Sequence, residues 1–254
     1  MIIKVLGCYG AEMPGFKTTC FKINDSTLLD AGAITSVMTQ EEQSKIKDIL
    51  VTHSHLDHIK DIALLADNAV DTNPHTINVI STSNIIEIIR ENIFNDMVWP
   101  DFTRIPVPEF PVITYIDIKP EEIFELNGLR ISAIEVNHVV PTVGYFIEDT
   151  NGTVAFSGDT CSTDRFWEKI NSTDNIKGIF LETSFPNNMQ ELADLSGHLT
   201  PAVMADEIKK LHRDDIPIYI YHLKPSFLDL IKSEIDSLND SRISIINMGD
   251  SFTF

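Results

Sequence analysis

The sequence has few cysteines, little positive charge and no long apolar run. Its three cysteines, Cys8, Cys20 and Cys161, are odd in number and lack paired spacing, which favours reduced thiols over a disulfide framework. Only 19 basic residues stand against 38 acidic ones, and a net charge of −19 opposes binding to a polyanion. The start, Met1–Gly7, turns polar too quickly for a signal peptide, and no stretch reaches membrane-spanning length. We therefore expect a cytoplasmic protein without a membrane partner.

Length and patterning indicate one folding unit. A chain of 254 residues with 43% hydrophobic content can bury one large core, and no linker, repeat or low-complexity tract divides it, so we expect a single domain over 1–254. Strand-like and helix-like patterns alternate in two sets of similar layout, the second running from about 129 to 246. In the first set, strands are predicted over 2–6, 49–51, 77–80 and 112–116, and helices over 59–66 and 84–92.

One short motif is rich in metal-binding side chains. His53, His55, Asp57 and His58 fall within six residues, directly after the segment 46–52, which ends in an apolar strand-like stretch. Imidazole nitrogen and carboxylate oxygen are donors that zinc, iron and manganese accept. An isolated His-x-His pair is more often a polar loop, but the complete H-x-H-x-D-H spacing, with further donors downstream, favours a metal site.

Three more candidate ligands each follow a segment with a strand pattern. Side chains at strand ends can collect at one edge of a sheet, and a carboxylate has two oxygens with which to bridge two ions. Taken alone, His138 or His222 could equally be a structural residue. These candidates are His138 after residues 129–136, Asp159 after 153–155, and His222 after 216–221. Gly158, just before the aspartate, would permit a close turn of the backbone.

In this order, the H-x-H-x-D-H motif, His138, the Ser-Gly-Asp-Thr segment and His222 resemble the metallo-β-lactamase superfamily. The resemblance implies an α+β fold, the four-layer αββα sandwich. It also implies two divalent metal ions, with zinc expected and manganese or iron as alternatives. The implied ligands are His53, His55 and His138 for one ion, Asp57, His58 and His222 for the other, and Asp159 between them.

Further stretches resemble the class II cyclic nucleotide phosphodiesterases within that superfamily. They are Leu6–Gly10, Val98–Phe102, Glu182–Asn187, Gly197–Pro201 and Tyr221–Ser226. The tRNA 3′-processing endoribonucleases also carry Glu-x-Thr and Gly-His-x-Thr segments, so they are an alternative. The acidic charge and the short stretch between Asp159 and Glu182, which holds no glycine-rich arm for tRNA, favour a small phosphodiester, above all a 3′,5′-cyclic nucleotide. A metal-dependent thioesterase or lactonase is another alternative. A sensor that binds a nucleotide without turning it over is disfavoured, because no position of the implied ligand set is missing.

The donors suggest how such a reaction would proceed. Two ions would lower the pKa of a water and supply a hydroxide, which Asp57 could orient. His198 is the candidate to protonate the leaving oxygen, and Glu182 could orient it. Alternatively, His198 caps or packs near the helix start predicted at Thr200. Lys224 is a candidate phosphate contact, although a lone lysine is usually just solvated.

The segment 94–111 is rich in aromatic residues and proline. Its Trp99 and Phe102 could form a lid on which a nucleobase stacks. They could equally form a contact between two copies of the chain, because exposed aromatic patches also mark interfaces. The sequence leaves both a lid and a homodimer open.

Overall fold

Two seven-stranded sheets form the centre of the molecule. The computed structural model describes residues 1–70, 72 and 74–254. The first sheet comes from the N-terminal half and is completed by the last strand of the chain, in the order β16-β1-β2-β3-β4-β5-β8. Its strands are β1 (Ile2–Gly7), β2 (Cys20–Ile23), β3 (Thr27–Leu29), β4 (Asp48–Leu50), β5 (Ile77–Thr82), β8 (Ile113–Ile118) and β16 (Ser251–Thr253).

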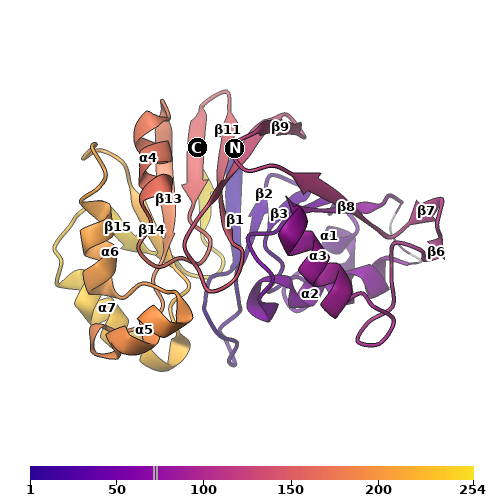
Figure 1. Cartoon of the computed structure of the whole chain (residues 1–254), viewed down its shortest axis with the longest axis horizontal. Helices are drawn as coiled ribbons and strands as arrows, with labels where there is room; N and C mark the ends of the chain where they lie inside the picture. The colour runs from indigo at the N-terminus through magenta and orange to yellow at the C-terminus, as the bar shows by residue number, and fades with distance from the viewer. Residues whose placement is uncertain (71, 73) are drawn as a thin grey trace.

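The second sheet comes from the C-terminal half, in the order β15-β14-β13-β12-β11-β10-β9. Its strands are β9 (Ile123–Leu126), β10 (Leu129–Glu135), β11 (Val143–Asp149), β12 (Gly152–Phe156), β13 (Ile176–Glu182), β14 (Ile218–Tyr221) and β15 (Ile243–Ile245). A separate hairpin, β6 (Pro106–Val107) with β7 (Phe110–Pro111), lies at one end of the molecule, on the right of Figure 1.

Helices cover the outer face of each sheet, and the predicted αββα sandwich is confirmed. Helices α1 (Gln40–Gln43), α2 (Leu56–Ala69) and α3 (Ser83–Asn92) lie with the first sheet (Figure 1). The helices beside the second sheet are α4 (Asp164–Ser172), α5 (Gln190–Ser196), α6 (Pro201–Ile208) and α7 (Leu228–Asp236), with the short 3₁₀ turns η1 (Asn187–Met189) and η2 (Pro225–Phe227). Within the described part of the chain, no helix has both the length and the apolar character needed to cross a lipid bilayer.

Aromatic side chains join the two sheets. Phe21 of β2 lies 5.2 Å from Phe156, 5.5 Å from Phe180 and 5.4 Å from Tyr221 of the second sheet, measured between ring centroids. Successive side chains of a strand point to opposite faces, so Ile179 joins the core under the outer helices while its neighbour Phe180 joins the core between the sheets. This alternation holds the sheets face to face.

Parallel pairing explains why functional loops meet at one edge. Strands β3, β4, β5 and β8 pair in parallel, as do β12, β13, β14 and β15. The carboxyl ends of parallel strands lie at the same edge of a sheet, where ligands usually bind in open sheets. The loops that follow β4, β12, β13 and β14 carry most of the candidate site residues.

The predicted strands and helices of the first half agree with the structure to within a few residues. The largest shift is at α2, which begins at Leu56 instead of residue 59. His55 is the N-cap in an extended conformation, so Asp57 and His58 already lie in the first helical turn. The sequence suggested a loop there because the motif is polar, whereas the motif itself opens the helix.

The expectation for the segment 94–111 requires a correction. Phe102 is only 2% exposed and packs edge-on against Phe94, so it belongs to the core and cannot form a lid or an exposed contact. Trp99 is half-buried against the same core. Phe110 on the hairpin is 78% exposed. A homodimer contact through the segment 94–111 stays a prediction, as does a lid formed by Trp99.

Candidate metal centre

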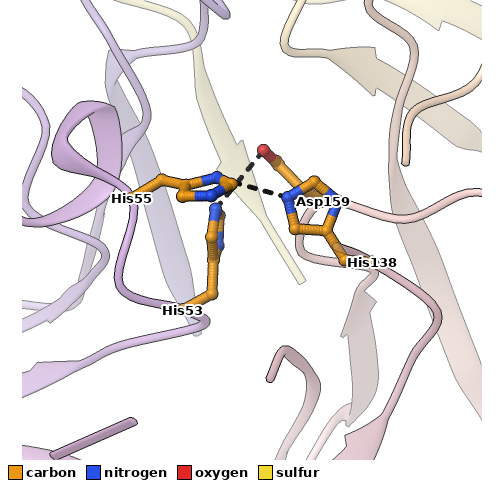
Figure 2. Close-up of side chains that lie close together, drawn as sticks. All are labelled: His53, His55, His138 and Asp159. Atoms are coloured by element: carbon orange, nitrogen blue, oxygen red, sulfur yellow. Dashed lines mark hydrogen bonds and ion pairs between the residues drawn. The ribbon is translucent and has the colours of Figure 1, made fainter. Parts of the chain in front are cut away.

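Four of the predicted ligands form a first group of side chains that turn toward one another (Figure 2). Their donor atoms all lie within 4.8 Å of one another. His138 Nε2 lies 3.3 Å from His55 Nδ1, and His53 Nε2 lies 3.5 Å from Asp159 Oδ2. The loop after β4 supplies two of these residues, and the ends of β10 and β12 supply the other two.

The remaining predicted ligands, Asp57, His58 and His222, form a second group with the same spacing. His222 Nε2 lies 3.2 Å from His58 Nε2 and 3.3 Å from Asp57 Oδ2. Asp159 Oδ2 lies 3.3 Å from each of the two imidazole nitrogens in this group. Asp159 therefore contacts both groups, as a residue between two ions would.

The donor atoms fit divalent ions. Among the described residues, buried His53 Nε2 and Asp159 Oδ1 have no hydrogen-bond partner, although buried polar atoms nearly always have one. A cation in the first group would satisfy both atoms. In the second group, His58 Nε2 and His222 Nε2 face each other with a carboxylate beside them, which is the donor mix of zinc sites.

Four of the imidazoles are anchored through Nδ1, which leaves Nε2 for the centre. Such anchoring fixes the tautomer and orientation of a metal-binding histidine. The anchors are Thr52 Oγ1 for His53 at 3.0 Å, Asp30 Oδ2 for His58 at 2.7 Å, Gly197 O for His138 at 2.8 Å, and Ser184 Oγ for His222 at 2.8 Å. These four hydrogen bonds therefore fix the direction in which the imidazoles present Nε2.

Asp30 is a site residue that the sequence analysis missed. It follows β3 with a φ of 57° and is 1% exposed. Besides His58, its carboxylate accepts the backbone N–H of Thr52 at 2.8 Å and the Thr52 hydroxyl. The available signal was its position directly after the apolar pair Leu28-Leu29, the same signal that singled out Asp159.

Burial keeps the histidines of the first group neutral. Desolvation lowers the pKa of His53 well below its usual range, helped by the nearby His58. Desolvation also lowers the pKa of His55 and that of His138. A neutral imidazole has a free lone pair, so this electrostatic environment favours the form that binds a metal.

The second group holds acidic and basic partners together. Burial opposes a charged His58, but Asp159, Asp30 and Asp57 outweigh burial and raise the pKa of His58 well above its ordinary value. Burial would likewise raise the pKa of Asp159, but His222 and His58 hold it well below its usual range. The pKa of Asp57 is lowered too, against burial, by His58 and His222. The carboxylates therefore need positive charge here, which a divalent cation would supply.

The predicted acid and its orienting carboxylate form a hydrogen-bonded pair. His198 Nδ1 lies 2.8 Å from Glu182 Oε1 and 4.0 Å from Asp159 Oδ2. Glu182, fully buried at the end of β13, also accepts the Thr160 N–H at 3.1 Å. Burial opposes protonation of His198, but Glu182 outweighs it and raises the pKa of His198. The pair thus lies directly beside the ligand groups.

His198 has two other conceivable roles, as a metal ligand and as a helix cap. Its donor atom also falls within 4.8 Å of those of Asp159 and His222, so a ligand role is geometrically open. A capping role for His198 is not what the structure has, because the Thr200 side chain caps α6 by accepting from Val203 N.

Lys224, the predicted phosphate contact, is held by protein groups. Its ammonium donates to the carbonyl of Gly10 and lies 5.6 Å from the ring centroid of Phe185. It is close enough to His198 to oppose protonation of that imidazole electrostatically. Substrate binding by Lys224 stays a prediction.

Two glycines let the backbone approach the site. Gly158 has a φ of +65°, and a Cβ there would meet Val143 O at 2.8 Å, so the close turn predicted before Asp159 is present. Gly10 was missed: a Cβ would come within 2.6 Å of His222 O and 2.9 Å of its ring. His222 itself has a φ of 69°, a strained value typical of functional positions.

Comparisons with known proteins agree with this geometry. A family model described as "Beta-lactamase superfamily domain" matches residues 28–217. A probable 3′,5′-cyclic-nucleotide phosphodiesterase of Yersinia pestis is 27% identical, over 96% of this chain and 79% of that protein. A ribonuclease Z of Agathobacter rectalis is 33% identical over half of this chain and 41% of its own length. The crystal structure of unliganded yeast PDE1 superimposes with a TM-score of 0.84 at 19% identity, over 98% of both chains.

The family match spans most of the chain, from β3 to the residue before β14. The likeness to yeast PDE1 extends the same fold to nearly the whole chain. The sandwich and the convergence of histidines and aspartates at one edge are what the resemblance implied. The chain belongs to the β-lactamase superfamily, and within it is a metal-dependent hydrolase.

Proposed function

We propose that this chain hydrolyses a small phosphodiester, and that its substrate is a 3′,5′-cyclic nucleotide. The observation that carries the proposal is the His198–Glu182 pair, hydrogen-bonded at 2.8 Å beside Asp159. A cyclic phosphodiester with an alkoxide leaving group needs a proton donor next to the site of attack. The name of the Yersinia pestis relative supports the same substrate class.

The chain's own residues have separate tasks in this proposal. Two divalent ions, when bound, would supply a nucleophile that is active near neutral pH and would offset the negative charge of the phosphate. Asp57, 27% exposed on its side chain, accepts a hydrogen bond from the attacking group and orients it. His198 donates its Nδ1 hydrogen to Glu182, so Nε2 is the atom that gives a proton to the departing sugar oxygen.

The surroundings favour a small substrate over RNA. A groove of about 780 Å³ borders His138, with Ser83, Asn84, Val139 and Arg165 among its lining residues. This volume falls in the range of small-molecule sites. A net charge of −19 works against a polyanion. The ribonuclease Z relatives make tRNA processing the alternative to test.

We propose zinc for both ions, with manganese or iron as alternatives. The seven ligands proposed are the members of the two groups: His53, His55, His138 and Asp159 in the first, and Asp57, His58 and His222 in the second. Their nitrogen-rich composition suits zinc, and structurally bound calcium or magnesium would prefer all-oxygen ligands.

The test is a substrate panel with the metal-loaded protein. Cyclic AMP, cyclic GMP, bis(p-nitrophenyl) phosphate, a precursor tRNA and a thioester are supplied in turn, and metal content is measured on the same samples. We expect turnover of the cyclic nucleotides. Cleavage of precursor tRNA or of the thioester alone would reject the proposal.

The variant His198→Ala separates the acid role from a ligand role. We expect it to keep both ions and to lose about 10²–10⁴-fold in kcat on cyclic nucleotides, the usual contribution of a general acid. Loss of one ion from His198→Ala would instead make the residue a ligand, and unchanged turnover would remove it from the reaction. His212→Ala is the matched control, because that histidine is exposed and lies outside both groups.

A further inference from the structure

Ser184 lies at the junction of the acid pair and the second ligand group. Its side chain is fully buried in the loop that follows β13. Ser184 Oγ lies 2.8 Å from His222 Nδ1, 3.2 Å from Glu182 Oε2 and 3.3 Å from His198 Nδ1. It also lies 3.2 Å from the carbonyl oxygen of His222.

A hydroxyl has one proton to donate, so these four neighbours cannot be equivalent. The Nδ1 hydrogen of His198 is already given to Glu182 Oε1 at 2.8 Å. If Ser184 gives its one proton to the carboxylate of Glu182, the short 2.8 Å contact must have His222 Nδ1–H donating to Ser184 Oγ. The Ser184 proton goes to Glu182 Oε2, because a carboxylate is a stronger acceptor than the His222 carbonyl at the same distance.

We propose that Ser184 is a positioning residue that sets two functional groups at once. By accepting from His222 Nδ1, it keeps that imidazole in the tautomer whose Nε2 lone pair faces the second ligand group. By donating to Glu182 Oε2, it fixes the carboxylate that orients His198. This inference deepens the proposed function and rests on it for the role of His198, while the role toward His222 rests on geometry alone.

The arrangement has a consequence for single substitutions. Without the hydroxyl, His222 Nδ1–H and Glu182 Oε2 both lose a buried partner, and the ring of His222 is free to take the other tautomer. Outer-sphere partners of metal-binding histidines typically account for 10–100-fold in metal affinity. Loss of the same hydroxyl also leaves His198 less well oriented. The resulting loss in turnover should be larger for a leaving group that needs a proton.

The experiment uses Ser184→Ala, with Ser184→Gly as a second way to remove the hydroxyl and Ser184→Thr to restore it. Ser81→Ala is the matched control, since Ser81 is also fully buried, donates to the carbonyl of Val51 at 2.7 Å and lies outside both ligand groups. Zinc affinity is measured by chelator competition. The His222 tautomer is read from ¹⁵N chemical shifts of the histidine rings in the metal-free protein. Circular dichroism checks that each variant folds.

We expect Ser184→Ala to bind one of two zinc ions 10–100-fold more weakly and to populate both tautomers of His222. At saturating zinc, its kcat on cyclic AMP should fall more than its kcat on bis(p-nitrophenyl) phosphate, because p-nitrophenolate leaves without a proton. Ser184→Thr should recover both properties, and Ser81→Ala should retain them.

Several outcomes would overturn the assignment. The assignment is wrong if Ser184→Ala or Ser184→Gly keeps both the zinc affinity and the His222 tautomer of the wild-type protein. An equal loss in Ser81→Ala, or a folded Ser184→Thr that recovers nothing, would reduce the effect to general packing. If the wild-type protein cleaves no phosphodiester, the proposed function fails, yet the zinc and tautomer measurements still decide the role of Ser184 toward His222.

Discussion

Asp30 and His58 form a buried pair in which carboxylate Oδ2 and imidazole Nδ1 are 2.7 Å apart. The two residues come from the ends of different elements, β3 and the first turn of α2. Because Asp30 holds Nδ1, His58 presents Nε2 to His222 and Asp159. The contact therefore holds the first turn of α2, which carries two of the proposed ligands, against the end of β3 in the first sheet.

Replacing Asp30 should therefore weaken metal binding. We expect Asp30→Ala to lose 10–100-fold in affinity for zinc, because His58 would lose the partner that fixes its ring. Asp30→Asn should lose less, since its amide oxygen can still accept from Nδ1. Calorimetric zinc titration measures both. Asp67→Asn, on the exposed face of α2, removes one negative charge without touching the site; an equal loss there would mean that net charge alone is responsible.

Gly10→Ala should disturb His222 from the opposite side. The added Cβ would lie 2.6 Å from the His222 carbonyl oxygen, so the loop or the histidine must move. We expect a loss of about 1–3 kcal/mol in the free energy of unfolding, with weaker zinc binding. Denaturant titration and zinc competition measure the two effects. Gly15→Asn serves as control, because nothing lies within 4 Å of its Cβ and asparagine tolerates its positive φ; the idea is wrong if both variants behave alike.

Phe21→Ala tests the core between the sheets. Phe21 is fully buried and contacts three aromatic rings of the second sheet, so we expect a loss of about 3–5 kcal/mol in the free energy of unfolding. Chemical denaturation followed by circular dichroism provides the measurement. Phe110→Ala, at a 78% exposed position, should change stability by less than about 0.5 kcal/mol. Comparable losses in the two variants would contradict the assignment of Phe21 to the core.

The three cysteines should differ in reactivity. Burial raises the pKa of the Cys8 thiol to about 12 and also raises that of Cys20. The pKa of Cys161 is raised by burial as well, but its side chain is only half-buried and thus accessible to reagent. We expect one thiol to react quickly with Ellman's reagent in the native protein and three to react in guanidinium chloride. Fewer than three in denaturant without reductant would argue for a disulfide, and against the reduced thiols and cytoplasmic location predicted from the sequence.

Much of the candidate site could be predicted from the sequence because its signals are local. The H-x-H-x-D-H spacing and the position of His138, Asp159 and His222 after strand-like runs are visible in short windows of the chain. Parallel strands then bring such positions to the same edge, and the structure gathers these residues in two groups. The family resemblance supplied their order.

The residues that orient the site could not be found in this way. Asp30 meets a histidine 28 positions away, and Ser184 meets one 38 positions away. Neither belongs to a motif whose spacing indicates such a contact. Phe102 was misjudged for the same reason: its aromatic and proline-rich neighbourhood suggested an exposed segment, but Phe94 and the core bury it.

Short stretches of sequence were enough to show which chemical groups are present and where strands end, because donor type and apolar periodicity are properties of neighbouring residues. The packing of the chain in three dimensions was needed to show that Asp30 contacts His58 and that Ser184 joins His222 to Glu182. Those contacts depend on how two sheets pack and on which loops their edges bring together. Distances of about 3 Å between residues far apart in the chain are set by that packing.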